Sequence, residues 1–226
     1  MHDIAQMLRM AAGASVPVTR QAGGTAAANI SASTTFTTAA LAVGDAQPSR
    51  FVVATIAAIR SNGLSPQDCL VTAVNIGGVA ATKLVGLGAQ QPGAEPYIDR
   101  CMWGASIPAG ATATVAVTVN RTITAYCVSL EAVYDALVTP AYTTSNTYGP
   151  DVPIMGVERG LVLSGNIGGG EVLGPSMTYI TEFGTGAPEY VNVLSAFYRP
   201  VASALVNTID SYTGYIHTVS VSFAPR

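Results

Sequence analysis

Polar and apolar residues alternate most regularly in the stretch that ends at Asn120. From residue 112 to residue 120, Ala and Val occupy the odd positions, while Thr and Asn occupy every even position except Ala116. This period of two is typical of a strand with one buried face. Just before it, Pro108 and Gly110 suit the backbone angles of a three-residue turn. The sequence therefore predicts a β-hairpin over residues 103–120 with a Thr-rich outer face.

A second pattern is the nearly continuous apolar run of residues 51–59, bounded by Arg50 and Arg60. A strand covered on both faces has this pattern, and the β-branched residues favour a strand over a helix of the same length. We therefore expect a central strand here. Similar segments predict further strands at residues 29–38, 39–43, 70–75, 80–85, 97–107, 124–134, 159–167, 177–183, 190–198, 204–209 and 215–223, with a two-residue turn at Gly77-Gly78.

The first residues follow a helical period instead. In residues 3–13, Asp3 provides an N-cap, Gly13 provides an end, and one face is apolar. This apolar stripe comprises Ile4, Met7, Leu8 and Ala11. So short a helix is marginal alone in water, and we expect the stripe to dock either on its own domain or on a partner. Residues 14–28 are rich in Gly, Ala and Thr without a period, which predicts an extended linking arm.

The two halves of the remaining chain carry similar segments in the same order. The corresponding segments are 50–54 with 159–163, 70–77 with 177–184, 97–107 with 190–199, and 126–134 with 216–223. Their identity is too low to separate a duplication from a shared spacing of turns, and both explanations stay open. The predicted organisation is a helix and arm at residues 1–28 and one β-sandwich domain at residues 29–226, with candidate pseudo-repeats at 50–134 and 159–223.

Composition narrows the classes of function. Charged residues make up 10% of the 226 residues, against roughly 25% in typical globular domains, so we expect much of the surface to contact other protein. The net charge of −3 and the single lysine, Lys83, argue against binding of a nucleic-acid backbone. The cysteines Cys69, Cys101 and Cys127 lie in or beside apolar segments and are expected to be buried free thiols of a protein made in a reducing cytosol.

Candidate chemistry is sparse. The chain has two histidines, no His-x-x-x-His or Cys-x-x-Cys spacing and no nucleophile elbow, so we expect no enzyme, metal or cofactor. The adjacent charges Asp99-Arg100 and Glu158-Arg159 are expected at solvated rims or subunit contacts. Tyrosine exceeds the other aromatic residues and is abundant in the predicted loops of the second half. Such tyrosines either bind at a surface or cap the ends of a sandwich, and the candidates for surface binding are Tyr142, Tyr148 and Tyr212.

Three runs of the chain are distinctive in combination. They are Arg50-Phe-Val-Val-Ala, Val74-Asn-Ile-Gly-Gly-Val-Ala-Ala-Thr82 and Trp103-Gly-Ala-Ser-Ile-Pro-Ala-Gly-Ala-Thr-Ala-Thr-Val115. Together they resemble β-sandwich structural proteins of tailed-bacteriophage virions, in which a paired-glycine turn precedes a Trp and a Pro-x-Gly turn. The resemblance covers residues 29–134 and continues weakly to the end of the chain. It implies a non-enzymatic particle component in many copies, attached by its N-terminal arm.

The sequence thus predicts an all-β chain, an antiparallel, jelly-roll-like β-sandwich of about ten strands with a short N-terminal helix and an extended arm. The resemblance implies a head-decoration, minor capsid, spike or fibre-type subunit that forms homo-oligomers and contacts capsid or tail proteins. It also implies a location in the virion after assembly in the bacterial cytoplasm. The alternative is a carbohydrate- or receptor-binding module on the particle surface, which would contact a host glycan. Neither interpretation involves nucleic acid or a membrane.

Overall fold

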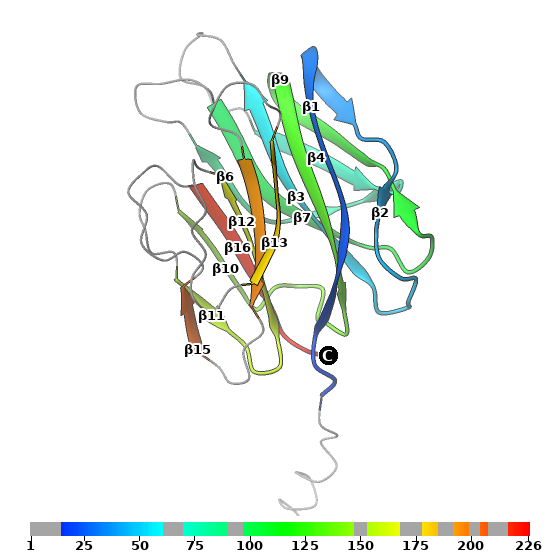
Figure 1. Cartoon of the computed structure of the whole chain (residues 1–226), viewed down its shortest axis with the longest axis vertical. Helices are drawn as coiled ribbons and strands as arrows, with labels where there is room; N and C mark the ends of the chain where they lie inside the picture. Colours follow the sequence, from blue (N-terminus) through cyan, green and yellow to red (C-terminus); the bar gives the residue numbers. More distant parts are fainter. Residues whose placement is uncertain are drawn as a thin grey trace, which may run out of the picture.

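The computed structural model describes residues 15–60, 70–89, 97–146, 153–167, 178–184, 192–198, 204–207 and 217–226. These residues form sixteen strands and no helix (Figure 1), which confirms the all-β prediction for this part of the chain. Three of them, β2, β5 and β8, are only two residues long, and the thirteen longer strands still exceed the ten or so expected. The helix predicted at residues 3–13 lies outside the described ranges. Within those ranges nothing helical is long and apolar enough to cross a bilayer.

Seven strands form a curled antiparallel sheet around the predicted central strand. They are β1 (Thr19–Thr37), β3 (Phe51–Arg60), β4 (Val71–Ile76), β5 (Val79–Ala80), β6 (Thr82–Ala89), β7 (Tyr97–Ser106) and β9 (Val115–Tyr134). Their order is β5-β4-β9-β3-β7-β6, and β1 pairs with the side of β9 that faces away from β3. Residues 51–59 of β3 are all buried, which confirms the expectation of a strand covered on both faces.

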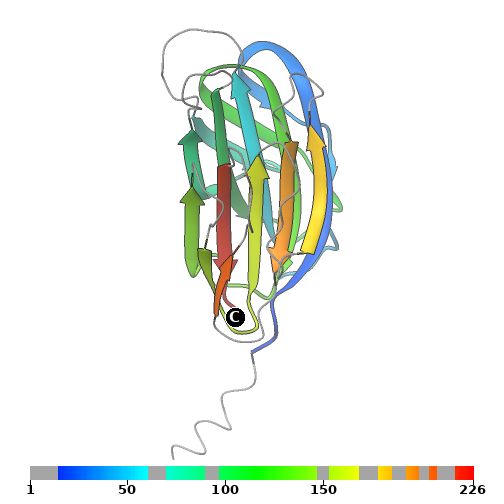
Figure 2. The same cartoon turned by 60° about the vertical axis from the view of Figure 1, so that its left-hand side comes forward.

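A second antiparallel sheet comes from the end of the chain. In the order of the sheet, its strands are β10 (Tyr142–Asn146), β16 (His217–Phe223), β12 (Leu161–Ile167), β14 (Asn192–Tyr198) and β13 (Thr178–Gly184). Figure 2 shows this sheet facing the viewer, with yellow β13 beside blue β1. Its other edge strand, β10, approaches β6. Two short pairs complete the described part, β2 (Leu41–Ala42) with β8 (Thr112–Ala113) and β11 (Pro153–Gly156) with β15 (Ala204–Asn207).

Two apolar clusters stabilise this arrangement because side chains alternate between the faces of each strand. One cluster lies between the two sheets and includes Phe51, Val53, Val133, Leu161, Leu163, Val221 and Phe223. The other lies on the opposite face of β3, β7 and β9, inside the curl of the larger sheet, and includes Val52, Ile56, Val117, Trp103, Val128 and Leu130. The larger sheet is therefore buried on both faces along its central strands.

The hairpin predicted at residues 103–120 does not form, because its two strands do not pair with each other. The predicted alternation of buried residues and the turn are confirmed. Ala or Val is buried at the odd positions 113–119, and the turn residue Gly110 has a φ of 83°. However, β3 lies between β7 and β9 in the sheet. The buried guanidinium of Arg50 donates hydrogen bonds of 2.5–2.8 Å to carbonyl oxygens of the turn, those of Ile107, Ala109 and Gly110. These bonds hold the turn against the start of β3, so that the chain crosses β3 instead of returning beside β7.

Strands β9 and β1 are longer than expected. Residues 124–134, predicted as a separate strand, continue without a break from residues 115–119 in β9. β1 pairs with β9 from Thr19 opposite Tyr134 to Thr37 opposite Ala116, with three register shifts. Residues 19–28 are therefore a paired strand and not the free arm predicted, since the edge of β9 supplies backbone hydrogen-bond partners that composition does not reveal. The division predicted at residue 28 falls inside β1.

The two sheets have strands in the same relative order. We number the five strands of each set from one to five along the chain. In both β1-β9-β3-β7-β6 and β10-β16-β12-β14-β13, the neighbours across the sheet are then strands one, five, two, four and three. β12, β14 and β16 occupy the places of β3, β7 and β9, as the sequence comparison expects. The counterpart of β13 is β6, however, and not residues 70–77, because β4 pairs with β9 and lies outside the repeated order.

Matched positions of the two sheets meet in the middle of the molecule. Phe51 pairs with Val133 as Leu161 pairs with Phe223, and all four side chains belong to the cluster between the sheets. With the sheets aligned on these pairs, Thr55 of β3 matches Gly165 of β12. A Cβ atom on Gly165 would lie 2.5 Å from Cγ2 of Thr55. The matched residues are thus in direct contact, as residues beside a two-fold axis would be.

The jelly-roll part of the fold prediction is not confirmed. In a jelly roll the chain passes back and forth between two sheets. Here, every described strand from β1 to β9 belongs to the larger sheet or to the β2–β8 pair, and the five-stranded sheet begins only at β10. The described strands therefore fill one curled sheet before the other.

Candidate interaction surface

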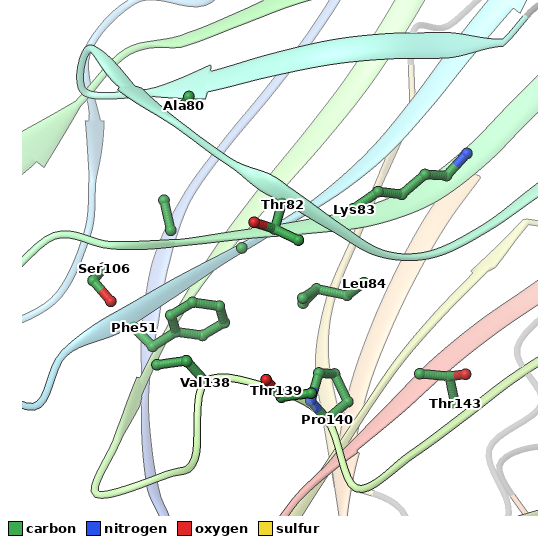
Figure 3. Close-up of a pocket in the computed structure, with 12 residues that line it drawn as sticks. Phe51, Ala80, Thr82, Lys83, Leu84, Ser106, Val138, Thr139, Pro140 and Thr143 are labelled. Atoms are coloured by element: carbon green, nitrogen blue, oxygen red, sulfur yellow. The ribbon is translucent and has the colours of Figure 1, made fainter.

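A cleft of about 430 Å³ opens where the edge strands β6 and β10 approach each other (Figure 3). The larger sheet contributes residues of β3, β5, β6 and β7, and the second half of the chain contributes residues 138–143. The apolar lining consists of Phe51, Leu84, Val138 and Pro140. The hydroxyl-bearing lining residues are Thr82, Ser106, Thr139 and Thr143. The cleft is thus shared between the two halves of the chain.

The aromatic ring of Phe51 forms part of the floor of the cleft. Phe51 is buried, and its ring packs edge-on against Phe223 with ring centroids 5.9 Å apart. Gly104 on β7 gives the Phe51 ring its space, because a Cβ atom at that position would collide with the ring. The ring is therefore held by the core between the sheets on one side and by the bare backbone of β7 on the other.

Exposed apolar side chains gather at this cleft. In the described part of the chain, six large apolar side chains are exposed, and four of them lie in the cleft lining or next to a lining residue along the chain. These four are Val79, Leu137, Val138 and Tyr142, with exposed fractions of 43–50%. Concave surfaces with a clustered apolar rim are typical of protein–protein contacts. The geometry therefore favours an apolar binding partner.

Charge plays little part in the cleft. Lys83 is the one ionisable side chain among the described lining residues, and Figure 3 shows its ammonium group directed away from Leu84 and Pro140. What faces the cleft is apolar surface with neighbouring hydroxyl groups. Such a lining binds by burial of apolar area and by neutral hydrogen bonds.

The structure describes only one of the predicted site residues. Tyr142 is 48% exposed at the start of β10, next to Thr143 of the cleft. The other two candidate tyrosines, Tyr148 and Tyr212, lie outside the described residues, as does the anchoring stripe of Ile4, Met7, Leu8 and Ala11. The three tyrosines are therefore not shown to form one surface. The cleft itself was missed because residues 51, 84 and 138 come from three separate patterns that sequence alone does not bring together.

Asp99 and Arg100 are buried, with exposed fractions of 0% and 1%, and the prediction that they form a solvated rim is wrong. The reason is that β7 lies inside a sheet whose two faces are both covered. Asp99 accepts a 2.6 Å hydrogen bond from the backbone nitrogen of Val71. Burial nevertheless raises the pKa of Asp99 to about 6, against the opposing effects of that bond and of Lys83. Burial disfavours the charged form of Arg100 as well, and it therefore lowers the pKa of this guanidinium.

A second buried carboxylate joins β1 to β9. Arg20 Nε donates to Glu131 Oε2 at 2.6 Å, and the Glu131 side chain is almost fully buried. Burial raises the pKa of Glu131, and the adjacent Arg20 opposes that rise. The thiols of Cys101 and Cys127 are free and buried as predicted, and burial raises the pKa of Cys127 to about 12. Cys69 lies outside the described ranges. These groups lie in the interior and are not part of the cleft lining.

The five-stranded sheet has an unexpected buried polar surface, which we call the hydroxyl face. It consists of Ser164, Thr218, Ser220 and Ser222, each at most 1% exposed. Ser220 Oγ donates to Ser164 Oγ at 3.0 Å, whereas the hydroxyls of Thr218 and Ser222 have no hydrogen-bond partner among the residues that the structure describes. The alternation of residues 218–222 predicts a solvated polar face. Here β11 contacts β10 and β16, and its Ile154 is buried.

Comparison with known proteins adds no relative to these observations. No group of three or more potential metal-ligating side chains occurs among the residues that the structure describes. No family model, no curated protein and no solved structure matches this chain.

Proposed function

We propose that the chain is a multi-copy structural subunit of a tailed-phage virion, a head-decoration, minor capsid or fibre-type protein that attaches through its N-terminal segment. It is a non-enzymatic protein that forms homo-oligomers and contacts other capsid or tail proteins. Assembly takes place in the bacterial cytoplasm. The observation that carries the proposal is the largely apolar cleft between β6 and β10, whose exposed rim suits a permanent protein contact.

Two further observations support this proposal. The chain carries 10% charged residues, too few to solvate the whole surface of an isolated domain in the usual way. The strand order, repeated in two sheets that touch through matched residues, supports a β-sandwich built from two pseudo-repeats. In that arrangement the seam between β6 and β10 corresponds to the seam between β13 and β1.

The test is incorporation into particles made from the genome that encodes the chain. We expect mass spectrometry of purified particles to find the chain in many copies. The Leu8→Glu variant of the full chain should fold normally and be lost from the particles, because a buried apolar anchor would become charged. Since β1 begins at Thr19, a deletion should remove only residues 1–14. Particles that lack the parent chain would overturn the proposal, and unchanged incorporation of both variants would contradict the anchoring role.

The alternative, a carbohydrate- or receptor-binding module, is supported by one specific observation. Tyr142 is exposed beside a cleft with four hydroxyl-bearing side chains, and aromatic rings stack on sugars. A glycan array probed with the parent chain and the Tyr142→Ala variant tests this alternative. Binding reduced at least tenfold by Tyr142→Ala, but not by Met155→Ala at an exposed position outside the cleft, would support it. Absence of binding by the parent chain would contradict it.

A further inference from the structure

We propose that the cleft between β6 and β10 receives the apolar stripe of residues 3–13 from a neighbouring copy of the chain. This inference rests on the proposed function, since it names the surface to which the N-terminal segment attaches. It makes the contact head-to-tail, with one edge of each copy as the donor and the opposite edge as the acceptor.

The acceptor has the shape and chemistry for an apolar helix face. Its volume of about 430 Å³ lies within the range of roughly 300–1,000 Å³ that is typical of binding pockets. Phe51 and Leu84 provide the apolar floor, and Val138 provides an exposed rim. No described side chain directs a charge into it. The stripe of Ile4, Met7, Leu8 and Ala11 is likewise uncharged, with the spacing of helix-in-groove anchors.

The N-terminal segment that would enter the cleft leaves from the opposite edge of the larger sheet. Val18 is buried between the sheets, and its backbone nitrogen donates to the carbonyl oxygen of Arg159. From there the strand order β1-β9-β3-β7-β6 separates the start of β1 from the cleft. Four strand spacings of about 4.8 Å make the path along the curled sheet from β1 to β6 about 19 Å. Val16, just before this fixed point, is 58% exposed, so the chain emerges at the surface with an apolar side chain.

The end of the molecule between donor and acceptor is already occupied. Ala136 bridges to Pro225, and the backbone nitrogens of Leu137 and Arg226 donate to the carbonyl oxygens of Ala224 and Asp135. A segment that docked in its own cleft would have to pass over these paired residues. A neighbouring copy presents the same cleft without that obstacle. Because the segment and the cleft are different surfaces, the contact repeats from copy to copy and gives either a closed ring or an open filament.

Cysteine cross-linking in the full chain tests the docking directly. The variants are Leu8→Cys, Val138→Cys and the double variant, oxidised and separated on a non-reducing gel, with the parent chain as the control for its own thiols. Mixing the two single variants should give a cross-linked dimer, and the double variant should give a ladder of oligomers. The Val138→Glu variant should weaken self-association at least tenfold in sedimentation. Met155→Glu, a matched exposed position outside the cleft, should leave self-association unchanged.

Each outcome decides the proposal. A cross-link confined to single chains of the double variant would overturn docking in a neighbour, and absence of any cross-link would overturn docking in the cleft. Either result leaves the proposed function standing if the chain is still found in particles. Conversely, if the chain forms cross-linked oligomers but is absent from particles, docking in the cleft of a neighbour is supported and the virion role is contradicted.

Discussion

The outer faces of the two sheets occupy matched positions but differ in chemistry. On the larger sheet, the face turned away from the partner sheet is apolar and includes Val128 and Leu130. At the matched positions of the five-stranded sheet stand Thr218 and Ser220 of the hydroxyl face. Both faces are buried. The strand order therefore does not depend on two apolar faces. The larger sheet has a second core, to which β2, β4 and β8 contribute Leu41, Val74 and Ala113.

The largest expected effect comes from the apolar face. Leu130→Ala should lower the free energy of unfolding by about 2–5 kcal/mol, because it opens a cavity in a fully buried cluster. Ser220→Ala at the matched position should cost only about 1 kcal/mol, from the lost hydrogen bond to Ser164. Chemical denaturation of both variants measures the difference. Equal costs would show that the two faces contribute alike to stability.

A reciprocal exchange sharpens the comparison at the next pair. Val128→Thr places a hydroxyl in an apolar cluster and should cost roughly 1–3 kcal/mol. Thr218→Val removes a buried hydroxyl that has no partner in the described part of the chain, and we expect stability to rise by up to about 1 kcal/mol. Thermal unfolding of the two variants checks the opposite signs. A loss of stability in Thr218→Val would show that its hydroxyl is hydrogen-bonded in solution.

The two faces should also differ in response to pH. Because burial raises the pKa of Asp99 from 3.8 to about 6, the folded chain binds a proton that the unfolded chain has lost between these values. Stability should therefore fall by at most about 3 kcal/mol from pH 4 to pH 6 and level off above that range. Asp99→Asn should flatten this part of the curve, while Ser222→Ala on the hydroxyl face should keep it. A slope retained in Asp99→Asn would assign it to another group, with buried Glu131 next to test.

The smallest effect concerns backbone strain. Arg159, before β12, and Asp135, after β9, have positive φ angles of 60° and 58°. Arg159→Gly should raise the free energy of unfolding by about 0.5 kcal/mol and the melting temperature slightly. The relief of strain exceeds the cost of the greater freedom of glycine in the unfolded chain. Asp135→Gly should gain less, since aspartate tolerates this conformation better than arginine. A loss in Arg159→Gly would indicate that the arginine side chain stabilises the fold.

The periodicity of the sequence was sufficient to predict where strands occur but not which strands pair with one another. The alternation of residues 112–120 and the apolar run of residues 51–59 predict two strands and their burial correctly. The pairing depends on Arg50, whose side chain holds the turn after β7 over the start of β3, and no local pattern encodes that contact. Residues 19–28 have too little apolar character to indicate a strand, because their partner is the backbone edge of β9.

The candidate site was harder to predict than the fold for a similar reason. Tyr142 was identified from its loop-like surroundings and is exposed at the cleft. Phe51 and Leu84 belong to predicted strands, yet nothing in their segments shows that residues 138–143 lie opposite them. The burial of Asp99 depends on strands that cover both faces of β7, which are distant in sequence. Long-range contacts of this kind decide the environment of a side chain, whereas local pattern decides only its strand.

The contact between Thr55 and Gly165 limits how similar the two halves can be. Two identical halves that faced each other in this way would place the same residue on both sides of the contact, and two threonines would need the same space. A chain in which these positions differ can carry a branched side chain on one side only. The asymmetric pair thus predicts covariation: in relatives that share this architecture, a larger residue at position 165 should accompany a smaller one at position 55.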